Sequence, residues 1–151
     1  MSRRQSQPEA WLIIPNGMEG DVRRALRKLP LGSGVLVLGR LRSNEALWLR
    51  HLAHLRQLAV AFEAEGTAAR VHNPVQLRNA LLSRTPLVFL SPIYPTSSHS
   101  DWVPLHPMRA AMLARLSGRK LGALGGMDAR KYSRVKDLGF RYWAGISAFR
   151  S

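Results

Sequence analysis

Residues able to carry chemistry follow several of the apolar runs in this 151-residue sequence. Arg40 and Arg42 come after the run 35–38 and are two positions apart, so on extended backbone they point to the same side. Two guanidinium groups placed in this way suit a phosphate or diphosphate, although solvated loop arginines are the plainer interpretation. His72 follows the run 67–71 and can move protons near neutral pH, whereas a lone histidine is more often structural.

The second half of the chain adds hydroxyl groups and glycines in similar places. The stretch 91–101 (SPIYPTSSHSD) contains two prolines and then four hydroxyl side chains, which can surround an oxyanion or simply form a polar turn. Gly125 and Gly126 precede a predicted helix start, where glycine allows a ligand to approach and helix N–H groups favour an anion. Ile146 and Ser147 end the last apolar run and offer a further amide and hydroxyl.

The elements that must position these residues alternate along the chain. Continuous apolar runs of about four residues are typical of buried parallel strands, and apolar residues three or four apart predict amphipathic helices. We predict strands at 12–15, 35–38, 67–71, 87–90, 121–124 and 142–146, and helices at 21–28, 44–65, 74–84, 108–116 and 129–138. This alternation predicts an α/β fold with a parallel sheet and right-handed crossovers.

Chain length limits the size of this sheet. A (β/α)₈ barrel needs about 200 to 250 residues, so at about 25 residues per unit this chain holds about six βα units. We therefore predict a TIM-barrel-like sheet that is truncated or incomplete, in a single domain at 11–151 after a polar N-terminal tail at 1–10. Such a sheet leaves unpaired edges, which we expect either the helix 44–65 or a homodimer to cover.

Composition narrows the class of protein. The formal net charge is +14, with basic residues scattered along the chain, and there is no cysteine, which excludes disulfides and thiolate chemistry. The plainest interpretation of the charge is an arginine-rich solvated surface; it also suits phosphorylated small substrates, and nucleic acid is a weaker interpretation. No apolar run reaches the length of a membrane helix, so we expect a cytoplasmic protein with no membrane partner. His51 and His54 have no visible third partner for a metal.

Taken in order, these segments resemble the thiamine-phosphate synthase and thiazole tautomerase (TENI) family of small TIM barrels. The resemblance is good from about residue 67 onward and loose over 11–66. Four segments carry it: 71–73 (VHN), similar to the family's [AV]-H-[ST]; 91–98 (SPIYPTSS), similar to G-P-I-[FY]-P-T-x-[ST]; 123–127 (ALGGM), similar to [AG]-[IL]-G-G-[IM]; and 144–148 (AGISA), similar to its final strand.

The resemblance implies a transferase of thiamine biosynthesis, which joins a hydroxymethylpyrimidine diphosphate to a thiazole phosphate and releases diphosphate. It places Arg40 on the family's diphosphate-binding arginine, Arg42 on its lysine and His72 on the acid–base histidine of the tautomerase branch. The positions it implies for the thiazole phosphate are Thr96, Ser98, Gly126, Ile146 and Ser147, with Gly125 beside them.

The departures from the family concern its charged and metal-binding positions. Leu38 stands where the family has glutamine and His99 where it has lysine. The family's magnesium-binding Asn-Asp pair and second aspartate have no clear counterpart, so any Mg²⁺ is expected to arrive on the substrate diphosphate. Two alternatives therefore stay open, a thiazole tautomerase-like enzyme using His72 and a phosphate-binding module without catalysis.

Overall fold

The predicted alternation of strands and helices is confirmed in the computed structural model, which describes residues 7–94, 107–116, 121–146 and 149. The elements in chain order are β1 (Ala10–Ile14), α1 (Gly20–Lys28), β2 (Gly34–Val37), α2 (Ser43–Arg56), β3 (Ala59–Phe62), the 3₁₀ turn η1 (Glu63–Glu65), β4 (Ala68–Val71), α3 (Pro74–Leu82), β5 (Leu87–Leu90), α4 (Pro107–Leu116), β6 (Leu121–Leu124), α5 (Ala129–Val135), the 3₁₀ turn η3 (Lys136–Leu138) and β7 (Phe140–Gly145).

Within the described residues, the strands form one seven-stranded sheet in the order β3-β2-β1-β7-β6-β5-β4. Every neighbouring pair is parallel, for example Leu12 beside Val35 and Leu124 beside Ala144. Consecutive strands are adjacent except β3 and β4, and the last strand lies beside the first, which is the order of a parallel barrel. The sheet is therefore a nearly closed, TIM-barrel-like α/β fold, as the sequence predicts, with its opening between β3 and β4.

The opening between β3 and β4 is bridged by the short segment that joins them. The backbone N–H of Thr67 donates to the carbonyl of Phe62 at 3.2 Å, and the Thr67 hydroxyl accepts from the Phe62 N–H at 2.7 Å. Glu63 then pairs with Arg70 through two contacts of 2.8 and 3.0 Å. Local turn contacts thus link the two edge strands where other neighbours have a hydrogen-bonded ladder.

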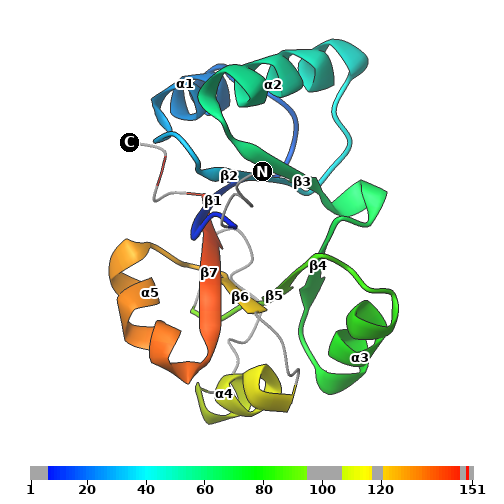
Figure 1. Cartoon of the computed structure of the whole chain (residues 1–151), viewed down its shortest axis with the longest axis vertical. Coiled ribbons are helices and arrows are strands. Elements are labelled where there is room, and N and C mark those ends of the chain that lie inside the picture. The colour runs from blue at the N-terminus through cyan, green and yellow to red at the C-terminus, as the bar shows by residue number, and fades with distance from the viewer. Residues whose placement is uncertain (1–6, 95–106, 117–120, 147–148, 150–151) are drawn as a thin grey trace, which may run out of the picture.

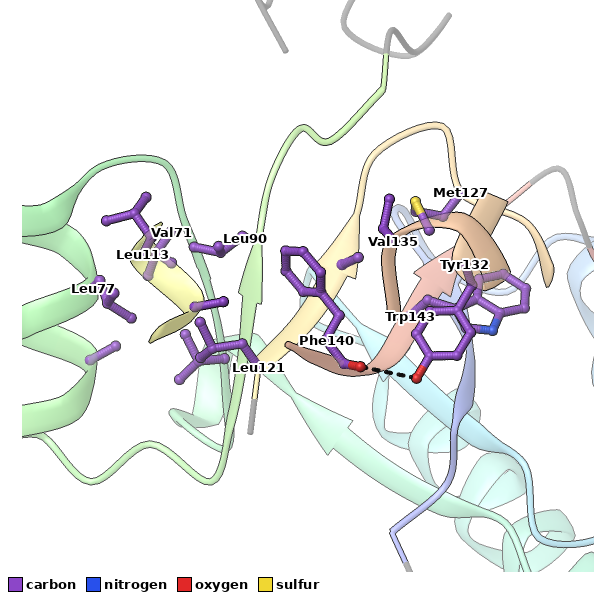
Figure 2. Packing of buried hydrophobic residues seen from close by; sticks show 14 residues of the cluster. Val71, Leu77, Leu90, Leu113, Leu121, Met127, Tyr132, Val135, Phe140 and Trp143 are labelled. Atoms are coloured by element: carbon purple, nitrogen blue, oxygen red, sulfur yellow. Dashed lines mark hydrogen bonds between the residues drawn. The ribbon is translucent and has the colours of Figure 1, made fainter. Parts of the chain in front are cut away.

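Helices cover the outside of the sheet in two groups, with α1 and α2 on one side and α3, α4 and α5 on the other (Figure 1). Leu49 and Ala53 of α2 are buried in the outer cluster that contains Val35 and against which β3 also packs, so α2 covers the outer face of β2 and β3. The second outer cluster lies under α3, α4 and α5, where the Tyr132 hydroxyl donates to the Phe140 carbonyl at 3.2 Å (Figure 2). Burial raises the pKa of the Tyr132 phenol.

The predicted helix at 44–65 is wrong in its second half. The helix ends at Arg56, Gln57 takes a left-handed conformation with φ 54°, and residues 59–62 (AVAF) form the extra strand β3. Alanine and the apolar spacing of this stretch are compatible with a helix. Pairing with β2, which places Val60 beside Val35 and Phe62 beside Val37, decides for a strand. The sheet formed by the described residues therefore has seven strands rather than six.

The barrel interior is filled by side chains from alternate strand positions, including Trp11, Phe89 and Tyr142. The Tyr142 hydroxyl accepts from the Val88 N–H and donates to the Val88 carbonyl, each at 3.1 Å. The N–H groups of Leu87 and Ser91 donate to the carbonyls of Thr67 and Val71, on the β4 side of β5. The N–H and C=O of Val88 therefore point to the other side, toward β6. The pairing of β6 with β5 begins only at Phe89. Tyr142 therefore replaces a missing rung of the ladder.

Replacing Tyr142 by phenylalanine tests this role. Tyr142→Phe leaves the N–H and C=O of Val88 buried without these partners, so we expect the free energy of unfolding to fall by about 2 kcal/mol. Urea denaturation measures the change. Tyr94→Phe, which alters a half-buried tyrosine outside the barrel interior, is the control, and equal stability of Tyr142→Phe and wild type would contradict the role.

Across the described part of the chain, none of the helices combines the length and the apolar character needed to span a membrane.

Candidate functional site

The ends of β6 and β7 bring two of the predicted phosphate-binding segments together. Leu124 pairs with Ala144, so Gly125 and Gly126 lie beside Gly145 and Ile146 at the carboxyl end of the barrel. Gly125 and Gly126 have positive φ angles of 105° and 59°, which side chains rarely adopt. The backbone N–H groups of Gly126 and Ile146 donate to no described residue.

The segment after β5 crosses the end of β6 and explains why Gly125 is a glycine. A Cβ atom on Gly125 would lie 2.7 Å from the Cα of Pro92. The N–H groups of Ile93 and Tyr94 donate to the carbonyls of Leu124 and Gly125, at 2.9 and 3.1 Å. Hydrogen bonds therefore join the start of the predicted phosphate-binding loop 91–98 to the predicted phosphate-binding segment 123–127. Three predicted site residues, Thr96, Ser98 and Ser147, lie outside the described residues.

A cation that the sequence analysis missed lies at this rim. Lys131 is in the first turn of α5, and its Nζ donates to the Gly126 carbonyl at 2.9 Å and lies 5.1 Å from the centre of the Tyr94 ring. The Asp128 carboxylate caps the same helix by accepting from the Lys131 N–H at 2.8 Å. The only sequence feature that could have indicated this cation is the position of Lys131, five residues after Gly126.

His72 lies at the end of β4, two strands away from Gly126 in the sheet. Its Nδ1 contacts the carbonyl oxygen of Ser91 at the end of β5, and its backbone N–H donates to the Gln76 side chain at 2.7 Å. A carbonyl oxygen can only accept, so Nδ1 carries the proton. In the neutral ring the lone pair is then on Nε2, as a general base requires.

Arg40 and Arg42 follow β2, on the other side of β1 from the two glycines. Both are exposed, and Arg42 is the residue immediately before α2. The Glu45 carboxylate accepts from the backbone N–H groups of Arg42 at 3.0 Å and Met18 at 2.9 Å. These two hydrogen bonds lower the pKa of Glu45 and tie the loop of the two arginines to the loop after β1.

Comparison with known proteins assigns no family to this chain. No family model matches the chain, and no curated protein matches it. The arrangement itself is specific: of the predicted residues, the fold joins Gly125, Gly126 and Ile146, and places His72 and Arg40 at separate positions along the same rim.

Magnesium has no protein site among these residues. The described part of the chain contains no group of three His, Asp or Glu side chains able to hold a metal ion. Glu63, which lines the same hollow as His72, is occupied by its ion pair with Arg70. The described residues therefore do not fit a protein-bound Mg²⁺.

A larger hollow, of about 880 Å³, opens at the opposite end of the barrel. Its wall includes Trp11, Gln57, Ala59 and Pro86, which lie at or just before the amino ends of β1, β3 and β5. Parallel barrels carry their chemistry at the carboxyl ends of the strands. The rim with Gly126, His72 and Arg40 is therefore the candidate site, although the hollows lined by His72 (about 570 Å³) and by Arg40 (about 310 Å³) are smaller.

Proposed function

We propose that this chain binds a small phosphorylated molecule at the carboxyl ends of β6 and β7, in the manner expected of a thiamine-phosphate synthase-like protein. The observation that carries the proposal is the adjacency of Gly126 and Ile146, whose N–H groups donate to no described residue. The loops after the last two strands are the usual phosphate site of a parallel barrel. Backbone amides suit a phosphate because they donate without a bulky side chain.

Electrostatics support the same proposal. Lys131 brings a positive charge to the carbonyl of Gly126, and the net charge of +14 attracts anions to the whole molecule. The thiazole phosphate of the resembled family is a ligand of this type. Its phosphate would accept from the rim amides while the apolar Ile146 contacts the ring.

The proposal includes the full transferase reaction because the sequence resembles that of the thiamine-phosphate synthase family. The C–O bond of the pyrimidine-methyl diphosphate breaks with its electron pair leaving on diphosphate, and the thiazole nitrogen forms the new C–N bond. Positive charge near Arg40 stabilises the leaving diphosphate. Binding of the thiazole phosphate without turnover would instead identify a phosphate-binding module.

Calorimetric titration tests the phosphate site directly. We expect thiazole phosphate to bind the wild type and Gly126→Val to weaken that binding at least tenfold, because valine cannot keep a φ of 59° without strain. The matched control is Gly32→Val, since Gly32 also has a positive φ, of 81°, at the other end of the barrel. Absence of wild-type binding, or equal losses in the two variants, would refute the proposal. Parallel titrations with pyrimidine diphosphate, with and without Mg²⁺, test the second substrate.

Proton transfer by His72 is the second candidate function. The contact between Nδ1 and the Ser91 carbonyl favours it, because this contact assigns the proton of the neutral ring to Nδ1 and the basic lone pair to Nε2. On a bound thiazole phosphate, Nε2 would take a proton from the ligand and return it at another atom. Such an exchange needs neither a metal nor a diphosphate.

A further inference from the structure

The free edge of β3 lies beside the hollow of about 880 Å³ at the amino end of the barrel. Ala59 donates its N–H to the Ser33 carbonyl on the β2 side, so the N–H and C=O of the next residue, Val60, point to the open side. Neither group of Val60 has a hydrogen-bond partner among the described residues. The edge therefore offers one donor and one acceptor to a further strand.

The helix that the sequence expects as one cover for this edge lies elsewhere. α2 ends at Arg56, and its buried residues Leu49 and Ala53 pack on the outer face of the sheet (Figure 1). The hydrogen bonds between Phe62 and Thr67 close only the carboxyl end of β3. The part of the edge at Val60 is left for another chain.

The wall of this hollow carries no positive charge. The four longest stretches of the sequence without lysine or arginine are 5–22, 29–39, 57–69 and 85–108. Every residue that lines the hollow comes from one of these four stretches, and Glu9 is the only charged side chain among them. The fold thus gathers stretches that are far apart in the sequence into one neutral to acidic wall, on a chain whose net charge is +14.

The absence of basic residues indicates which kind of partner this wall fits. Nucleic acid and other polyanions are recognised by basic surfaces, which this wall is not. Two copies of a chain with a net charge of +14 repel each other, so they approach most easily where neither presents a positive charge. The wall also contains apolar surface to bury, since Leu31 is 65% exposed there.

We propose that two copies of this chain associate through β3, with the hollow closed between them. A two-fold axis at this edge runs the two β3 strands antiparallel, and the N–H and C=O of Val60 then exchange two hydrogen bonds with those of Val60 in the second copy. The apolar surface around Leu31 is buried on both sides of the axis. This surface lies at the opposite end of the barrel from Gly126, so the proposal does not depend on phosphate binding.

Sedimentation of the full chain at increasing concentration tests the association. We expect the wild type to pass from monomer to dimer, and Leu31→Glu to weaken the dimer at least about tenfold, because the buried carboxylate finds no lysine or arginine in either wall. This substitution lowers the net positive charge, so general repulsion predicts the opposite effect. Leu55→Glu is the matched control, since Leu55 is 64% exposed but lies on α2 outside the hollow, and it should not weaken the dimer.

Cross-linking locates the axis, because the chain has no cysteine of its own. Residues that exchange hydrogen bonds in antiparallel strands have Cα atoms about 5.5 Å apart, within the range that a disulfide bridges. Val60→Cys should therefore form a covalent dimer on mild oxidation. Leu55→Cys, which is more exposed, should form one only slowly, by random collision. Circular dichroism confirms that the variants are folded.

Three results would overturn the proposal. These are a wild type that stays monomeric at every concentration, equal weakening of the dimer by Leu31→Glu and Leu55→Glu, and faster cross-linking through Leu55→Cys than through Val60→Cys. Added salt should strengthen the dimer, because it screens the repulsion between the two chains, and weaker association at high salt would equally contradict a neutral interface. None of these measurements uses a phosphate ligand, so the failure of the proposed function would leave this proposal standing.

Discussion

Gly122→Ala should lower the free energy of unfolding by about 3 kcal/mol or more, because the added methyl group has no room inside the barrel. A Cβ atom at Gly122 would lie 2.2 Å from Cε2 and 2.3 Å from Cδ2 of Tyr142, and 2.6 Å from Cδ1 of Phe89. These rings pack edge to face with centroids 5.1 Å apart in the middle of the barrel. Neither can move without disturbing the other, and overpacking of a filled core is costly.

Gly20→Ala provides the control for this prediction. Gly20 is the first residue of α1, and a Cβ atom there meets nothing within 4 Å. Alanine has the higher helix propensity, so Gly20→Ala should leave stability unchanged or raise it slightly. Urea denaturation of both variants measures the difference. A Gly122→Ala protein as stable as wild type would mean that Tyr142 does not cross the face of β6 inside the barrel.

His72→Asn should slow proton exchange on bound thiazole phosphate by about 100- to 10,000-fold, the usual contribution of a general acid–base group. Asparagine keeps a side-chain N–H that can donate to the Ser91 carbonyl, which the imidazole Nδ1 contacts in the structure. It has no basic nitrogen in the place of Nε2. The variant therefore separates the hydrogen bond from the proton transfer, and deuterium incorporation followed by NMR measures the rate.

The affinity for thiazole phosphate distinguishes a catalytic His72 from a binding one. Gly126 and Ile146 lie at other strands, so His72→Asn should leave the dissociation constant within about twofold of wild type. His51→Asn, an exposed histidine on α2, should change neither rate nor affinity. A wild-type exchange rate in His72→Asn would exclude proton transfer by this residue, whereas loss of both rate and affinity would give it a structural role.

Local sequence patterns were sufficient to find most of the fold. Continuous apolar runs such as 87–90 and 121–124 are typical of buried parallel strands, and these two form β5 and β6 with the predicted bounds. Asp128 and Asn73 accept from backbone N–H groups at the starts of α5 and α3, where local chemistry indicates helix starts. The strand at 59–62 is not predicted because its apolar residues fit the periodicity of a helix as well as that of a strand, and because no glycine or proline marks the end of α2.

The sequence by itself determined which residues end the strands, and therefore that Arg40, His72, Gly126 and Ile146 lie at the carboxyl rim of a parallel sheet. Only the tertiary structure decided which of them meet. The order β2-β1-β7-β6 places Ile146 beside Gly126 and Arg40 elsewhere, and the packing of α2 gives Arg40 the neighbour Arg50. The physical reason is that strand formation reflects local hydrophobicity, whereas strand order and helix packing depend on contacts between residues far apart in the chain.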